Sequence, residues 1–166
     1  MTVCRSLSVG SKKGPTKSGW SGYQVRQIPR SHFPNFVEIA TRWMDNDVYG
    51  HVNNVQYYSY FDTAVNQFLI TSGVLNMQSD AVVGFVVDSA CAYFSPVAFP
   101  DRVHVGLRVA RIGTTSVRYE LAVYRNDAQW PSAAGHFVHV YVDKSSQQSV
   151  PVPIAVRAVL EGLQRQ

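Results

Sequence analysis

The chain has 166 residues, 46% of them hydrophobic and 16% charged, which predicts one globular domain large enough to bury a core. No apolar run is long enough to span a membrane, and Cys4 and Cys91 are too few for a disulfide framework, so free thiols in a reducing compartment are expected. Residues 1–37 hold six basic residues and no acid, whereas residues 38–166 hold nine basic and eleven acidic residues. A nucleic-acid-binding face on the folded part is therefore not expected.

Residues 1–31 are rich in Ser, Gly, Lys and Arg and have no hydrophobic periodicity, which predicts a basic, disordered tail. Basic residues and serines without acids are also typical of an organellar transit peptide. The expected location is therefore the cytoplasm, with a mitochondrion or another organelle as the alternative. Residues 32–166 are expected to form the single domain.

The stretch RWMDNDVYGHVNN, residues 42–54, places ionisable groups directly before a predicted helix. Asp45 and Asp47 come first, His51 follows, and Asn53 is a suitable N-cap because its side-chain oxygen can accept a helical N–H. The start of a helix presents unpaired N–H groups and a partial positive charge. The stretch therefore predicts a place where a developing oxyanion is stabilised beside a carboxylate and an imidazole.

The predicted helix runs to about residue 70 and is apolar nearly all round, so it should be wrapped by other structure. Its inward stripe is expected to include Asp62, a carboxylate that would line a ligand pocket or bond another strand. Alternating or β-branched segments predict strands, and the last apolar segment predicts a short helix at 151–163. The predicted strands are 36–41, 81–94, 102–111, 116–125 and 133–142.

This order predicts an α+β fold in which an antiparallel sheet of about five strands curls around one central helix. A single curled layer leaves exposed edge strands, and a second copy of the chain would shield them. A homodimer or a dimer of dimers is therefore expected.

Residues 36–142 resemble hotdog-fold thioesterases of the 4-hydroxybenzoyl-CoA thioesterase type, and residues 42–54 carry most of the resemblance. The resemblance implies that Asp47 attacks the thioester or activates water, while the backbone N–H of Asn54 polarises the carbonyl. His51 would bond Asp47 or the substrate, or would instead orient the loop. Asp45 is expected to be structural.

The resemblance also implies that the CoA nucleotide binds near a turn formed by Arg111, Gly113, Thr114 and Thr115, often from the neighbouring subunit. These are ordinary turn residues as well, and that interpretation stays open. Tyr57 is expected, with Asp62, in the substrate pocket.

The sequence thus predicts an acyl-CoA thioester hydrolase of lipid metabolism that needs no cofactor, since CoA is part of the substrate. No metal is expected, because no histidine has other metal-ligating residues near it at the spacing of a metal site. The alternatives are a thioesterase acting on acyl carrier protein and a non-catalytic acyl-CoA-binding hotdog protein. The run GHVNN also resembles plant acyl-ACP thioesterases, but Tyr49 stands where those enzymes have an asparagine.

Overall fold

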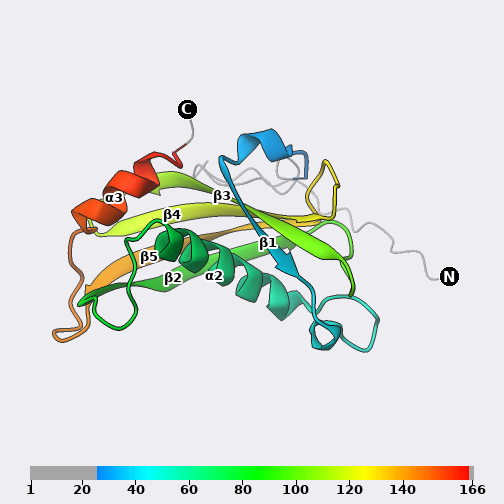
Figure 1. Ribbon diagram of the computed structural model, residues 1–166, viewed down its shortest axis with the longest axis horizontal. Coiled ribbons are helices and arrows are strands. Elements are labelled where there is room, and N and C mark those ends of the chain that lie inside the picture. The colour runs from blue at the N-terminus through cyan, green and yellow to red at the C-terminus, as the bar shows by residue number, and fades with distance from the viewer. Residues whose placement is uncertain (1–25, 165–166) are drawn as a thin grey trace, which may run out of the picture.

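The computed structural model describes residues 26–164, and Figure 1 shows helix α2 lying across one face of a five-stranded sheet. The strand order is β1-β3-β4-β5-β2, and every neighbouring pair is antiparallel. The strands are β1 Asn35–Ala40, β2 Val82–Tyr93, β3 Arg102–Ile112, β4 Ser116–Arg125 and β5 Ala133–Asp143. The helices are α2 Asn54–Thr71 and α3 Ile154–Glu161, with 3-10 turns η1 Arg30–His32 and η2 Trp43–Asp45. The predicted fold class is confirmed.

The face that α2 buries differs in phase from the predicted stripe. Its buried residues are Tyr57, Tyr60, Phe61, Ala64, Val65 and Leu69. The prediction that Asp62 faces inward was wrong, because the side chain is exposed and bonds Asn66 one turn later. Val55, in the first turn of the helix, is also exposed, at 60%. A helix that is apolar nearly all round offers several stripes of helical spacing, so periodicity alone does not fix which one is buried.

The core between α2 and the sheet is centred on Phe61, which is fully buried. Its ring packs edge-to-face on Phe137 of β5, with centroids 5.8 Å apart. Gly135 makes this approach possible, because a Cβ there would collide with the Ala90 carbonyl oxygen and lie 2.6 Å from the Phe61 ring. A glycine in the middle of a strand thus serves close packing of backbone and aromatic ring.

The opposite face of the sheet is partly covered by the segment before β1. Phe33 packs there with Ala122, Tyr124 and Ala134, and the Tyr124 hydroxyl donates to the Ile28 carbonyl at 2.7 Å. The Arg30 guanidinium lies 5.1 Å from the Tyr124 ring centroid. The packed part of the chain therefore begins before residue 32, where composition placed the boundary. The expected disorder of residues 1–25 lies outside the described residues.

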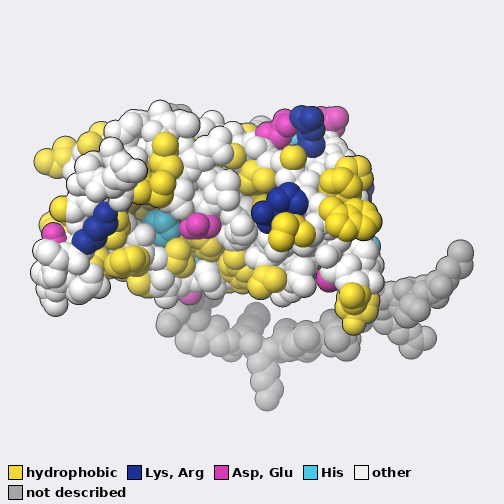
Figure 2. Space-filling model, turned by 60° about the horizontal axis from the view of Figure 1, so that its bottom comes forward, with side chains coloured by type: hydrophobic (Ala, Val, Ile, Leu, Met, Phe, Trp, Pro, Cys, Tyr) yellow, Lys and Arg dark blue, Asp and Glu magenta, His cyan; other side chains and the backbone are white. Residues whose placement is uncertain are grey.

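Among residues 26–164, β2 stands at the edge of the sheet and pairs with β5 alone. Four of its large apolar side chains are exposed: Phe85, Val86, Val87 and Tyr93. Figure 2 brings the lower side of Figure 1 forward, where β2 lies, and shows hydrophobic side chains spread over it. Among residues 26–164, no helix is long and apolar enough to cross a membrane.

Candidate active site

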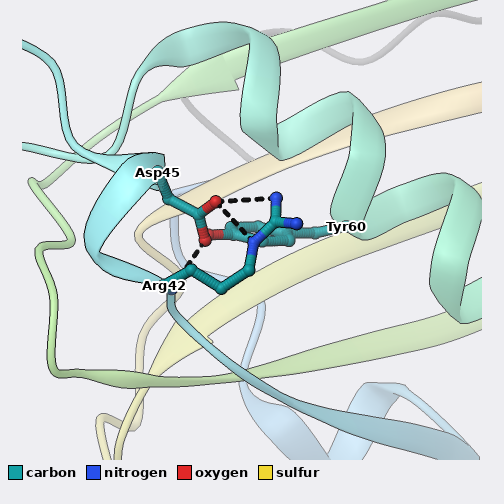
Figure 3. A network of polar contacts seen from close by, with 3 residues as sticks. All are labelled: Arg42, Asp45 and Tyr60. Carbon is teal, nitrogen blue, oxygen red and sulfur yellow. Dashed lines mark hydrogen bonds and ion pairs between the residues drawn. The ribbon is translucent and has the colours of Figure 1, made fainter.

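The loop between β1 and α2 is built around one buried carboxylate, Asp45, which is fully inaccessible (Figure 3). It accepts hydrogen bonds from the Arg42 backbone N–H at 2.8 Å, from Arg42 Nε at 2.9 Å and from the Tyr60 hydroxyl at 2.9 Å. Burial by itself would raise the pKa of Asp45, but these bonds to the ionised form outweigh it and lower the pKa. The expected structural role of Asp45 is confirmed.

The rest of the loop is tied to the connection between β2 and β3. The Val52 N–H donates to the Val97 carbonyl at 2.7 Å, and the Phe99 N–H donates to Asn46 Oδ1 at 3.1 Å. The Asn53 N–H donates back to the Asp45 carbonyl at 2.8 Å. These bonds satisfy buried backbone groups and fix the entry of the chain into α2.

Asp47 and His51 face each other across a tight turn in this loop. The Asp47 N–H donates to the His51 carbonyl at 2.9 Å, and Gly50 takes a φ of +80°, a left-handed conformation that favours glycine. Asp47 is partly exposed, and its Oδ1 accepts the Tyr49 N–H at 2.8 Å. Within the described part of the chain its Oδ2 has no hydrogen-bond partner, and no bond joins it to the exposed His51 side chain. One carboxylate oxygen is therefore available to a ligand.

The N-terminus of α2 follows this turn. Asn53 is the N-cap, as predicted, and its Oδ1 accepts the Val55 N–H at 3.1 Å. The Asn54 N–H has no acceptor among residues 26–164, while the Asn54 carbonyl accepts the Tyr93 hydroxyl at 3.1 Å. An unpaired N–H at the positive end of an 18-residue helix can stabilise an oxyanion.

Tyr57 lies in the core rather than at a surface opening. It is 4% exposed, and its ring contacts Tyr60 and Tyr93. Burial raises the pKa of its hydroxyl to about 12, with a smaller contribution from Cys91. Asp62 is exposed rather than turned inward, and the place of Tyr57 in a substrate pocket stays a prediction.

The predicted nucleotide turn lies between β3 and β4, and its backbone is held by the C-terminal segment. The Gly113 carbonyl accepts Arg157 Nη2 at 2.6 Å, and the Thr114 carbonyl accepts the Val152 N–H at 2.9 Å. The Thr115 carbonyl accepts the Tyr141 N–H at 2.8 Å. The Arg111 and Thr114 side chains are exposed, so charge and hydroxyl remain free to meet a ligand.

The two groups of predicted site residues lie at opposite ends of the sheet. Ala40, just before the loop, pairs with Arg102 at the start of β3, whereas the turn follows the end of the same strand. Eleven residues of extended chain separate these points by roughly 33 Å. A single chain therefore does not bring Asp47 and Arg111 together.

One buried polar residue, His139, was not singled out from the sequence. It is 3% exposed, and neither ring nitrogen has a hydrogen-bond partner among residues 26–164. The strict alternation of β5, which turns Phe137, His139 and Tyr141 to the same buried face, was the available signal.

Comparison with known proteins gives the family. A family model for the thioesterase-like superfamily matches residues 41–160. The PA5185 protein of Pseudomonas aeruginosa PAO1 is 51% identical, covering 83% of this chain and 96% of that chain, with a TM-score of 0.81. The PA2801 protein of the same species is 33% identical over 76% of this chain and 98% of that one, with a TM-score of 0.72.

A thioesterase of Thermus thermophilus, solved with coenzyme A and Zn, is 29% identical, covering 80% of this chain and 95% of that chain, with a TM-score of 0.66. The family match spans the loop before α2, α2 itself and all the long strands. The chain therefore belongs to the thioesterase-like superfamily and is a thioesterase with the hotdog fold.

Proposed function

We propose that the protein hydrolyses acyl-CoA thioesters, with Asp47 as the reacting carboxylate and the Asn54 N–H as the oxyanion donor. The observation that carries the proposal is the free oxygen of Asp47 next to a helix start whose first N–H is unpaired. The CoA bound to the Thermus relative supports CoA as the carrier. The resemblance of residues 42–54 to the 4-hydroxybenzoyl-CoA thioesterase type supports the same assignment.

The chemistry follows two balanced routes. In one, an Asp47 oxygen attacks the thioester carbon, CoA leaves as thiolate, and water then cleaves the mixed anhydride. In the other, Asp47 takes a proton from water as the water attacks the same carbon; the tetrahedral intermediate then collapses, the C–S bond breaks, and the leaving CoA thiolate takes up that proton. Both routes yield the free acid and CoA thiol, and both develop negative charge on the carbonyl oxygen, where the Asn54 N–H and the α2 dipole stabilise it.

Dimerisation through β2 is part of the proposal, because one chain separates the two halves of the site. Pairing two β2 strands antiparallel about their middle would place the Tyr93 end of one copy beside the Val82 end of the other. The Tyr93 end holds the α2 N-terminus. The Val82 end lies beside the end of β5, which bonds the Thr115 turn. Asp47 of one copy would thus share a substrate with Arg111 of its partner.

The test is release of free thiol from acyl-CoA substrates of graded length and shape. Asp47→Asn should lower kcat by about 10²-fold or more, because a nucleophile or general base contributes at least this much. Asp62→Asn is the matched control, since Asp62 is exposed and bonds only Asn66 among the described residues. Near-wild-type turnover by Asp47→Asn would remove Asp47 from the mechanism. Activity on acyl carrier protein alone, or binding without thiol release, would favour the two alternatives.

A further inference from the structure

Tyr93 is the last residue of β2, and its side chain ties that strand to the first residue of α2. The Tyr93 hydroxyl donates to the Asn54 carbonyl at 3.1 Å, and no other side chain hydrogen-bonds Asn54 within the described part of the chain. Asn54 is also the residue whose N–H is the proposed oxyanion donor. The carbonyl and the N–H share one Cα, so a bond that fixes the first also restrains the second.

The Tyr93 side chain is itself held from two sides. Its backbone pairs with Ala133 at the end of the β2–β5 ladder, and the next N–H, that of Phe94, donates to the Ser132 carbonyl at 2.8 Å. Its ring packs edge-on against the buried Tyr57 ring, with centroids 5.1 Å apart. A side chain that stands on a strand and is backed by a buried ring holds its partner more precisely than a loop residue does.

The other anchors of this region act before Asn54. The backbone N–H groups of the two preceding residues donate to the Val97 carbonyl at 2.7 Å and to the Asp45 carbonyl at 2.8 Å. These bonds fix the chain up to the cap, but the first turn of a helix has unpaired N–H groups and frays most easily. Asn54 is exposed, so packing of its side chain adds little. The Tyr93 bond is therefore the contact that carries the rigidity of the sheet to Asn54 itself.

The Tyr93 hydroxyl is suited to holding a partner rather than to proton transfer. Partial burial raises its pKa above the ordinary value, and the neighbouring Cys91 raises it further. The hydroxyl therefore stays protonated near neutral pH and keeps donating to the Asn54 carbonyl.

We infer that Tyr93 is a positioning residue of the reaction: its bond to the Asn54 carbonyl holds the Asn54 N–H in the place where the oxyanion forms. The inference rests on the proposed thioester hydrolysis and adds to it a residue that acts through Asn54 rather than on the substrate. A donor stabilises an oxyanion only when it is held in place beforehand, and a misplacement of about 1 Å can cost about 10²-fold in rate. Loss of the hydroxyl should therefore lower kcat and leave KM nearly unchanged.

The first test measures the Asn54 amide in the full-length protein without any thioester. NMR relaxation should show a more mobile Asn54 N–H in Tyr93→Phe than in the wild type, and thermal melts verify that the variant folds. Tyr58→Phe is the matched control, since it also removes a tyrosine hydroxyl near the start of α2, but one without a hydrogen-bond partner among the described residues. It should leave the amide unchanged. Equal motion of the Asn54 N–H in Tyr93→Phe and the wild type would overturn the inference.

Turnover is then measured as thiol release from acyl-CoA. Tyr93→Phe should lower kcat about tenfold and change KM less than about twofold, because the lost bond matters only where the oxyanion develops. Tyr58→Phe should keep both constants. Replacement of Tyr93 by p-aminophenylalanine, which keeps an N–H donor at the same place on the ring, should restore most of kcat. A loss that appears in KM instead, or that the amino group does not restore, would overturn the inference.

The pH dependence separates positioning from proton transfer. Between about pH 5 and 9 the kcat of Tyr93→Phe should be lower than that of the wild type by a constant factor, since the hydroxyl does not titrate there. Loss of one limb of the profile would make Tyr93 an acid or base and overturn the positioning role.

The same measurements separate this inference from the proposed function. If the wild type cleaves thioesters, Asp47→Asn does not, and Tyr93→Phe keeps its kcat, the inference fails while the function stands. If the wild type cleaves no thioester, the proposed function fails. A loosened Asn54 amide in Tyr93→Phe would then show a structural tie without catalytic consequence, which overturns the inference as well.

Discussion

Asp45 and Asp47 lie two residues apart and have opposite surroundings. Asp45 is fully buried and accepts three hydrogen bonds, from Arg42 and Tyr60, which stabilise its charged form. Asp47 is partly exposed and keeps one oxygen free of protein donors in the described part of the chain. A carboxylate that accepts three hydrogen bonds is a poor nucleophile or base, which fits a structural role for Asp45 and leaves Asp47 as the proposed reactive carboxylate.

The Tyr60 bond to Asp45 can be measured through stability. Tyr60→Phe should lower the free energy of unfolding by about 1.5–3 kcal/mol at pH 7, because a bond to a charged group is lost in a buried site. Since the folded-state pKa of Asp45 is depressed, its contribution is complete above the unfolded pKa, near 3.9, and is lost as pH falls through the folded value. Urea titrations should therefore show a smaller difference between wild type and Tyr60→Phe at pH 3 than at pH 7.

Tyr58→Phe is the control for this comparison, because the Tyr58 hydroxyl has no hydrogen-bond partner among the described residues and its ring stacks on Phe137. Loss of the hydroxyl there should change stability by no more than a few tenths of a kcal/mol. Equal losses for the two variants, or a Tyr60→Phe penalty independent of pH, would contradict the proposed contribution of Asp45.

Arg111 is exposed near the end of β3, beside the turn where the nucleotide is proposed to bind, so its charge would meet a remote part of the substrate. Arg111→Glu should raise KM for acyl-CoA with a smaller change in kcat, because the lost contact is common to ground and transition states. The penalty should shrink at high salt, where exposed charges are screened. A short thioester without the nucleotide serves as control, and equal loss of activity on it would place the nucleotide elsewhere.

Residue roles that depend on local sequence were predictable. Roles that depend on which side of a helix or strand faces the core were not. Asn53 as N-cap and Asp45 as a structural carboxylate follow from neighbours a few positions away. The burial of Asp62 and of His139 depends on which side of the helix or strand packs on the core, and tertiary packing decides this. Asp47 stays a prediction from the motif and the geometry around it.

At the scale of elements, the contact between α2 and the sheet depends on a missing side chain. Gly135→Ala should destabilise the fold by about 1–3 kcal/mol or more, because its Cβ collides with the β2 backbone and the fully buried Phe61 ring. Gly162→Ala is the matched control, since its Cβ would make only an ordinary contact, 3.4 Å from the Val159 carbonyl. Denaturant titration measures both, and a neutral Gly135→Ala would show that the strand can move aside.

The segment before β1 is a second element whose contribution can be measured. Composition assigned residues 1–31 to a dispensable tail, but Ile28 and Arg30 contact Tyr124 on the sheet. Deleting residues 1–31 should therefore lower the free energy of unfolding by about 1–3 kcal/mol relative to deletion of residues 1–25. Equal stability of the two truncated proteins would show that these contacts contribute nothing.

The strands were predictable because alternation is a local property, and each long strand begins and ends within about two residues of its predicted bounds. The register of β2 against β5 shifts between Val86 and Asp88. The one glycine of this strand, Gly84, does not mark the shift, because it pairs in register with Tyr141. The covering of the outer face by residues 28–36 was also missed. Those residues pack against Tyr124, some 90 positions later, and no short window of sequence contains such a contact.

For the whole molecule, the decisive feature is that Asp47 and Arg111 lie at opposite ends of a sheet whose edge strand β2 has no second partner strand within the described residues. A sequence motif identifies each half but contains no distance between them. If β2 pairing completes the site, each active site draws Asp47 from one chain and Arg111 from the other. This arrangement makes a prediction that a site within one chain does not share.

Asp47→Asn and Arg111→Glu chains, each nearly inactive at low acyl-CoA, should regain activity when mixed and reassociated. Random pairing makes about half of the dimers hybrid, and each hybrid has one site with both residues intact, so about a quarter of wild-type activity should return. Asp47→Asn mixed with the double variant carrying both changes should stay inactive, since no intact pair can form. Absence of recovery in the first mixture, with hybrids verified by mass spectrometry, would place both residues of each site in one chain and exclude the shared site.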